Sequence, residues 1–281
     1  MKIRYLISDL CALLADWAGY RRDVIHINMA RSFPDADYKE LVYLRREYYR
    51  HIFDLAVESI WGVFVSQKKL CEHVTMANPE LPDALSQKYD KMLFVMGHTG
   101  NWELIGAIAG NGKSDRNNKF TDRKLYFTYK KAKNRFVNKL LKKIRYSAFK
   151  KSASVGNIVE VKEALFEFVS QRNNGEKANY FIIADQSPKG NFVNVDFLNQ
   201  KSAFFRGAEY LSKKLNIPLV YMSMSRTTRG KYQIAFSLIE EFPAMCPDGE
   251  LTKRFAELLQ NDIMENKVNW LWSHKRWKTG F

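Results

Sequence analysis

The pattern of apolar and polar positions along the 281-residue chain predicts strands that alternate with helices. Short apolar runs bounded by polar residues or glycine, at 92–96 and 180–184, are typical of strands buried on both faces of a sheet. Longer segments with apolar residues every three or four positions are typical of amphipathic helices. The alternation predicts an α/β fold, a single-domain αβα sandwich with a central, mostly parallel sheet.

The same patterns give the order of the remaining elements. Helices are predicted at residues 3–18, between residues 20–22 and a turn at 32–35, from a cap at Asp37 through 55, and at 134–144, 157–171, 204–215 and 251–266. Strands are predicted at 125–129, 218–223 and 232–238, and the proline-containing segment 71–90 is predicted to be a connection. Ligands of such sheets bind at the carboxyl ends of the strands.

The helix predicted at 3–18 is apolar but is interrupted by Arg4, Asp9 and Asp16. It is too short and too charged to span a bilayer, and it lacks a secretory cleavage pattern. Two interpretations remain: a helix that lies in the membrane interface, or a helix that packs on the core.

Composition indicates an ordinary globular protein, with 46% hydrophobic residues and no linker rich in Pro, Gly or Ser. The three cysteines, Cys11, Cys71 and Cys246, are isolated and odd in number. They argue against a disulfide framework or a zinc knuckle, and they indicate a reducing, cytosolic environment.

Charge is the largest compositional anomaly, with 45 Lys and Arg against 30 Asp and Glu. The basic band, residues 123–151, contains twelve Lys and Arg and no acidic residue. So concentrated a charge favours an anionic partner: a phospholipid surface, a phosphorylated lipid, an acidic carrier protein or a nucleic acid. Charge alone does not choose among them.

Candidate acid–base chemistry lies at the end of the strand predicted at 92–96. Among five histidines only His98 is followed five residues later by an acidic residue, Glu103. If Gly100 takes an unusual backbone angle and Asn101 caps the next helix, Glu103 lies in the first helical turn and its carboxylate can point at the imidazole. The alternative is a loop histidine beside a solvated carboxylate.

Five blocks of sequence resemble one known family, the bacterial lipid A biosynthesis acyltransferases, a lauroyl/myristoyl transferase branch of the lysophospholipid acyltransferases. The blocks occur in the family's order and cover nearly the whole chain. They are YRRDVIHINMARSFPDAD (20–37), GHTGNWE (97–103), ADQSP (184–188), FLNQKSAFFRGAE (197–209) and WLWSHKRWK (270–278).

The resemblance implies a glycerolipid-acyltransferase-like fold and a single acyltransferase domain over 1–281, with an N-terminal helical region (1–66) and a catalytic α/β core (67–281). It implies transfer of a fatty acyl group from a thioester donor, usually acyl carrier protein with coenzyme A as the alternative, to a hydroxyl of a membrane glycolipid such as a lipid A precursor. We expect no cofactor or metal. His98 would be the general base and Glu103 its partner, because an alcohol attacks only as a base removes its proton.

The resemblance also implies a set of substrate-binding residues. Lys130 and Arg145 would contact phosphate or the carrier, or instead form a solvated basic helix face. Backbone amides after the strand, or a cation such as Arg145, could stabilise the oxyanion. Asp185 and Gln186 would form a wall of the site, although Asp185 could instead cap a turn. Arg206 would contact a substrate phosphate or instead form ion pairs near Glu209. The full set is Asn101, Lys130, Arg145, Asp185, Gln186 and Arg206.

Trp270, Trp272 and Trp277 would lie at a lipid interface or pack the C-terminal segment onto the sheet; we expect packing for Trp270 and Trp272.

Family members commonly begin with a membrane-spanning helix, whereas this sequence starts almost at the segment that would follow it. We therefore expect peripheral attachment to the cytoplasmic face of the bacterial inner membrane, through the N-terminal helix and the basic band. An aminolipid or another glycolipid is an alternative acceptor. The alternative from another class is a non-catalytic protein that binds anionic lipid or nucleic acid, and nucleic acid is disfavoured because its recognition motifs are missing.

Overall fold

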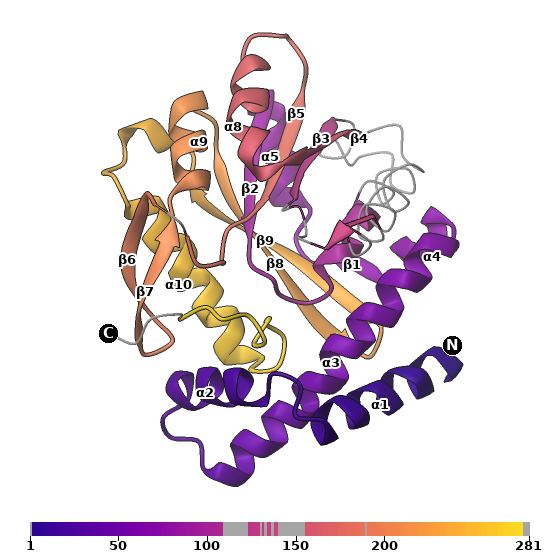
Figure 1. Cartoon of the computed structure of the whole chain (residues 1–281). Helices are drawn as coiled ribbons and strands as arrows, with labels where there is room; N and C mark the ends of the chain where they lie inside the picture. The colour runs from indigo at the N-terminus through magenta and orange to yellow at the C-terminus, as the bar shows by residue number, and fades with distance from the viewer. Residues whose placement is uncertain are drawn as a thin grey trace.

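A seven-stranded sheet forms the centre of the protein in a computed structural model, which describes residues 2–108, 123–129, 131, 134–135, 138–139, 155–188 and 190–277. The strand order is β1-β9-β8-β2-β5-β3-β4, and β6 and β7 form a separate antiparallel pair (Figure 1). Every neighbouring pair in the large sheet is parallel except β8 and β9. The predicted α/β class with a mostly parallel sheet is confirmed.

The elements have the following bounds. The helices are α1 (Lys2–Trp17), α2 (Arg22–Ser32), α3 (Tyr38–Phe64), α4 (Gln67–Cys71), α5 (Glu80–Lys88), the 3₁₀ helix η1 (Trp102–Ala107), α8 (Val161–Ser170), α9 (Gly207–Leu215), the 3₁₀ helix η2 (Pro243–Met245) and α10 (Glu250–Glu265). The strands are β1 (Val74–Met76), β2 (Lys91–Met96), β3 (Lys124–Tyr129), β4 (Val155–Glu160), β5 (Ala178–Ile183), β6 (Phe192–Phe197), β7 (Gln200–Phe205), β8 (Leu219–Thr228) and β9 (Lys231–Glu240).

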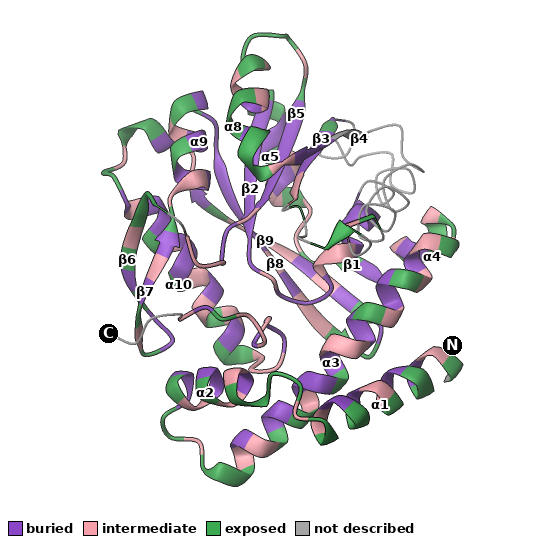
Figure 2. Cartoon of the chain, in the orientation of Figure 1, coloured by how far each residue is buried: buried purple, intermediate pink, exposed green. Residues whose placement is uncertain are grey.

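Strand β2 is buried along its whole length, as its unbroken apolar run predicts (Figure 2). Successive side chains of a strand point to opposite faces. Leu93 and Val95 accordingly join the core cluster that includes residues of α2, α9 and α10, whereas Phe94 and Met96 join the cluster that includes residues of α4, α5 and η1. The central strand therefore has a core on each side, which is the layered arrangement expected for this class.

The N-terminal helices are joined to the sheet by a buried carboxylate on α3. Glu58 accepts hydrogen bonds from Tyr5 Oη of α1 (2.9 Å), Asn101 Nδ2 (3.0 Å) and Tyr232 Oη of β9 (2.6 Å). A buried carboxylate is costly unless its oxygens are bonded, so these three donors fix α3 between α1 and the sheet. Figure 1 shows α1 running beside α3.

Several predicted elements are wrong in part. The segment 71–90 contains β1 and α5 rather than a simple connection, and the helix predicted at 157–171 begins only after β4, which extends the sheet beside β3. The helix predicted at 204–215 begins at Gly207, because 200–205 pairs with β6 in a hairpin. The two residues of its turn, Leu198 and Asn199, have φ of 52° and 58°. Glycine or asparagine normally marks both positions of such a turn, so the leucine concealed the hairpin.

The helix predicted at 134–144 lies mainly outside the described residues. The predicted starts of the other helices are close to those observed, and Asp37 caps α3 as expected, since its Oδ1 accepts from Glu40 N at 2.7 Å.

Candidate active site

Strand register brings His98 and Asp185 together. Strands β2 and β5 are parallel neighbours, and Met96 is paired with Ile183. His98 and Asp185 each follow two residues later, so both lie at the carboxyl ends of adjacent strands. His98 Nδ1 lies 2.5 Å from Asp185 Oδ1, and the backbone N–H of His98 donates to Asp185 Oδ2 at 2.8 Å.

Asp185 is 3% exposed and accepts a third hydrogen bond, from Trp270 Nε1 at 2.7 Å. Burial alone would raise the pKa of this carboxyl, but the His98 charge and the hydrogen bonds from His98 and Trp270 outweigh burial and lower the pKa to about 2. Asp185 is therefore an ionised, fixed acceptor for the imidazole.

The pairing determines which nitrogen of His98 is able to take up a proton. With Nδ1–H donating to Asp185, the lone pair of Nε2 is available as an acceptor. Gln186 Nε2 lies 3.4 Å from it, and the Trp102 ring packs edge-on to the imidazole with centroids 5.1 Å apart. The His98 side chain is 15% exposed. This arrangement suits a general base whose Nε2 receives a proton from a hydroxyl group.

Two glycines let the turn after β2 fit tightly between neighbouring elements. A Cβ on Gly97 would lie 2.5 Å from Leu259 Cδ1 of α10. Gly100 has φ of +57°, as predicted, and a Cβ there would lie 2.6 Å from the Met224 carbonyl oxygen of β8. The turn that carries His98 is thus pressed against both α10 and β8.

Asn101 anchors the turn rather than capping the helix as predicted. It lies at the N-cap position of η1, but its side chain is turned to α3, where Nδ2 donates to Glu58 and Oδ1 accepts from Ser59 Oγ at 3.3 Å. A hydrogen bond to a buried carboxylate is stronger than a capping bond to a backbone N–H would be. The role of Asn101 in substrate binding stays a prediction.

Glu103 lies in the first turn of η1, as predicted. In the structure the Nδ1 position of His98 is occupied by Asp185, a residue that the sequence placed in the wall of the site. The catalytic partnership of Glu103 with His98 stays a prediction.

Gln186 lies beside His98 as predicted, whereas the described contacts do not bring Arg206 there. Arg206 precedes α9 and forms ion pairs with Glu209 Oε1 (3.5 Å) and Asp248 Oδ2 (2.9 Å), in line with the ion-pair interpretation. Lys130 and Arg145, with most of the basic band, lie outside the described residues.

The sequence did not reveal how the C-terminal segment contributes to the site. Trp270 and Trp272 are buried, as expected for packing, and Trp270 in addition donates to Asp185. Arg276 is also buried; burial lowers its pKa to about 10, and the Asp185 charge opposes that shift. A signal existed for Asp185, since it follows its predicted strand closely, as His98 does. None existed for the Trp270 contact, which depends on tertiary packing.

Comparison with known proteins supports an enzyme of one class. A search of curated proteins found no match to this chain. The family described as bacterial lipid A biosynthesis acyltransferase matches residues 2–279, nearly the whole chain. The matched region includes the segments that carry His98 and Asp185. The resemblance of the five sequence blocks is thereby confirmed. The chain belongs to the bacterial lipid A biosynthesis acyltransferases, and its activity is acyl transfer.

Proposed function

We propose that the protein moves a fatty acyl group from acyl carrier protein to a hydroxyl group of a lipid A precursor, with His98 as the general base. The observation that carries this proposal is the Asp185–His98 pair at the carboxyl ends of β2 and β5, which leaves Nε2 as the acceptor nitrogen. A base held in one tautomer supports direct attack by an alcohol.

The chemical step follows from that geometry. The acceptor hydroxyl donates its proton to His98 Nε2 while its oxygen forms a bond to the thioester carbonyl carbon. Asp185 stabilises the resulting imidazolium through Nδ1–H. When the tetrahedral intermediate collapses, the C–S bond breaks and the imidazolium returns the proton to the departing thiolate. General-base assistance of this kind accelerates reactions by about 10²–10⁴-fold.

The negative oxygen of the intermediate needs hydrogen-bond donors. The backbone N–H groups of His98 and Gly100 are already engaged, with Asp185 Oδ2 and with Asn269 O at 3.0 Å. We therefore retain Arg145 as the proposed donor. Lys130 is proposed to contact a phosphate group, and Asn101, Gln186 and Glu103 to position the reacting groups beside His98.

Helix α1 supports a proposal for membrane attachment. One face, which includes Tyr5, Ser8 and Ala12, is buried, and α1 packs against α3. The opposite face exposes an apolar stripe over the full length of the helix (Figure 2). Its members are Ile3, Leu6, Ile7, Leu10, Leu13, Leu14 and Trp17.

Both interpretations of the N-terminal segment therefore have support, since one face packs and the other is available to lipid. Within the described residues, no helix is long and apolar enough to cross a membrane. We propose that α1 lies in the interface at the cytoplasmic face of the inner membrane, assisted by the basic band.

The function is tested by incubating the purified protein with acyl carrier protein that bears a fatty acid and with a lipid A precursor in detergent. Mass spectrometry should show a precursor heavier by one acyl group, together with free carrier thiol. The His98→Ala variant should be folded by circular dichroism and should lose the transfer.

Three outcomes would contradict the proposal. A mass gain on an aminolipid alone would replace the acceptor. Full turnover by His98→Ala would remove the mechanism. Salt-sensitive binding to anionic vesicles without thioester consumption would favour the non-catalytic alternative.

A further inference from the structure

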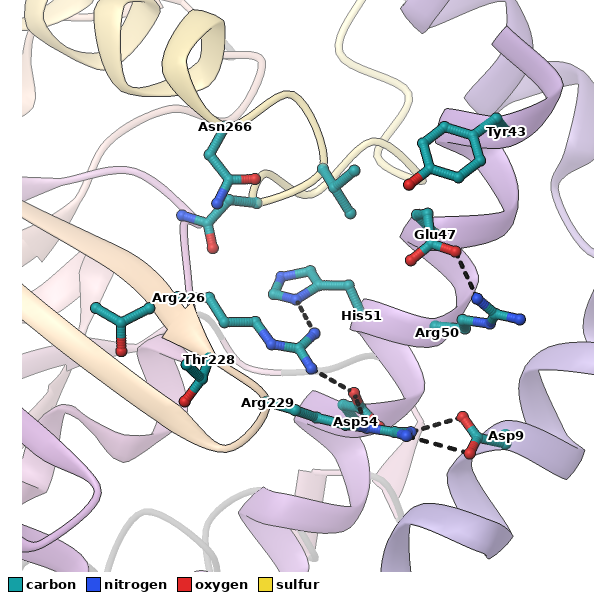
Figure 3. Close-up of a pocket in the computed structure, with 13 residues that line it drawn as sticks. Asp9, Tyr43, Glu47, Arg50, His51, Asp54, Arg226, Thr228, Arg229 and Asn266 are labelled. Atoms are coloured by element: carbon teal, nitrogen blue, oxygen red, sulfur yellow. Dashed lines mark hydrogen bonds and ion pairs between the residues drawn. The ribbon is translucent and has the colours of Figure 1, made fainter. Parts of the chain in front are cut away.

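A polar cavity of about 540 Å³ lies between α1, α3, the β8–β9 hairpin and the segment after α10 (Figure 3). It is separate from the catalytic pair, since neither His98 nor Asp185 lines it. Its walls include three arginines, three carboxylates, His51 and Asn269, with Tyr43 and Val268 as the apolar side chains. The residues that matter for its chemistry are at its base, around His51, and at its rim.

Two buried polar atoms at this cavity have no hydrogen-bond partner within the described part of the chain. His51 is 2% exposed, and its Nδ1 lies 3.3 Å from the Arg226 guanidinium, which can only donate. Nδ1 is therefore the acceptor and Nε2 carries the hydrogen, yet Nε2 is unpartnered. Burial lowers the pKa of His51 to about 3, so the ring is neutral.

The second unpartnered atom is Oδ1 of buried Asn269, whose Nδ2 donates to the Met224 carbonyl at 2.9 Å. A buried polar group without a partner loses its hydration without compensation. The wall of the cavity thus holds one unused donor and one unused acceptor, both buried. Hydroxyl groups, which both donate and accept, match this pair.

The charges that line the cavity balance, which favours a neutral ligand. Arg226 and Arg229 bind Asp54, at 2.8 and 2.7 Å, and Arg229 also binds Asp9 at 2.6 Å. The third pair, Arg50 and Glu47, lies at the rim with a separation of 2.6 Å. An anion would meet the carboxylates and a cation would meet the guanidiniums, whereas hydroxyl groups can bond to either member of each pair.

The rim supplies an aromatic surface, because the Tyr43 ring is 62% exposed beside Glu47 (Figure 3). Aromatic faces pack well against the C–H faces of sugar rings while the hydroxyls bond to polar groups. We propose that this cavity binds a neutral saccharide, either free or as the headgroup of a lipid. Asp9 lines the cavity from α1, the helix that also carries the apolar stripe.

The cavity is joined to the catalytic turn through Asn269. The Asn269 carbonyl accepts from Gly100 N at 3.0 Å, and the next residue, Trp270, donates to Asp185. A saccharide bonded to Asn269 would therefore contact the segment that holds the catalytic carboxylate. The binding proposal itself rests on the cavity alone and does not depend on acyl transfer.

Saturation-transfer NMR on the full chain tests the proposal, with methyl α-glucoside, methyl β-galactoside and N-acetylglucosamine as probes. At least one should bind, and Tyr43→Ala should weaken it about tenfold through loss of the aromatic face. Tyr38→Ala is the matched control, because Tyr38 is 71% exposed on the same helix and does not line the cavity. It should bind as the wild type does. His51→Phe, which fills the base, should abolish binding if it folds.

Each remaining outcome supports or overturns the proposal. Binding by His98→Ala at wild-type strength supports a separate site, and its loss would place the sugar at the catalytic centre. A glycolipid with the same sugar in detergent distinguishes the sources: tighter binding identifies a lipid-linked sugar and equal binding a free one. Failure of every saccharide, or displacement of a bound saccharide by inorganic phosphate, would overturn the proposal in favour of a water-filled cavity or an anion site.

Discussion

Asp185 is almost completely buried and yet ionised, so hydrogen-bond donors must replace the hydration that its charge loses on folding. Three hydrogen bonds, from the His98 backbone, the His98 ring and Trp270, replace that hydration. The bonds from His98 also orient the imidazole, so the same contacts stabilise the ionised Asp185 and hold His98 as a base. The His98–Asp185 pair can therefore be examined through folding as well as through turnover.

Acid unfolding should report the Asp185 contribution. The pKa of this carboxyl is about 2 in the folded chain, against 3.8 for an unperturbed aspartate. A carboxyl with a lowered folded-state pKa stabilises the protein above its unfolded pKa, and that contribution is lost as pH falls through the folded value. At about 1.4 kcal/mol per pKa unit, wild type should lose roughly 2 kcal/mol relative to Asp185→Asn between about pH 4 and pH 2.

Urea unfolding of both proteins across that range measures the difference in slope. Because all other carboxylates are shared, they cancel in the comparison. Parallel stability curves would mean that the folded structure does not hold Asp185 in its charged form.

At the scale of elements, the turn after β2 depends on Gly100 for two separable reasons. An alanine there adopts a left-handed backbone angle, at about 1–2 kcal/mol, and its Cβ also meets the Met224 carbonyl. Gly175→Ala is the matched control, because φ is +70° and its Cβ would meet nothing within 4 Å. We expect Gly100→Ala to melt at a lower temperature than Gly175→Ala and to transfer acyl groups more slowly. Equal melting temperatures and full activity would show that the close approach to β8 is unimportant.

The apolar stripe of α1 should govern membrane binding. Leu6→Glu with Leu13→Glu places two charges on the exposed face and should abolish flotation with liposomes, because a charged side chain is costly to bury in lipid. Leu165→Glu with Phe166→Glu adds the same charge on exposed apolar positions of α8 and should float as the wild type does. If the α1 variant still floats with liposomes, or if salt alone releases the wild type, then the protein binds the membrane through electrostatic attraction rather than through the apolar stripe.

For the whole molecule, the sequence predicts the fold class because buried parallel strands have continuous apolar runs, as at 92–96 and 180–184. It did not predict the β6–β7 hairpin, whose turn uses Leu198 at a positive φ, nor the short strand β1. Those elements are determined by tertiary pairing rather than by local pattern.

The candidate site shows the same division between local and tertiary information. The sequence identifies His98 because this residue follows a continuous apolar strand, and local spacing predicts Glu103 as its partner. Which carboxylate meets Nδ1 depends on the register of β2 against β5, separated by more than eighty residues, and on Trp270 from the far end of the chain. Local sequence determines neither the strand register nor that packing. It therefore predicts Asp185 near the site but not as the partner of His98.

The catalytic role of the His98–Asp185 pair is best tested by single-turnover acyl transfer in Asp185→Asn, measured beside His98→Ala and Glu103→Ala. Each variant is first shown to be folded by circular dichroism. We expect His98→Ala and Asp185→Asn each to lose about 10²-fold or more in rate, with a loss in Asp185→Asn at least as large as in Glu103→Ala. A wild-type rate in Asp185→Asn, or full turnover by His98→Ala, would mean that the His98–Asp185 pair is not the catalytic base.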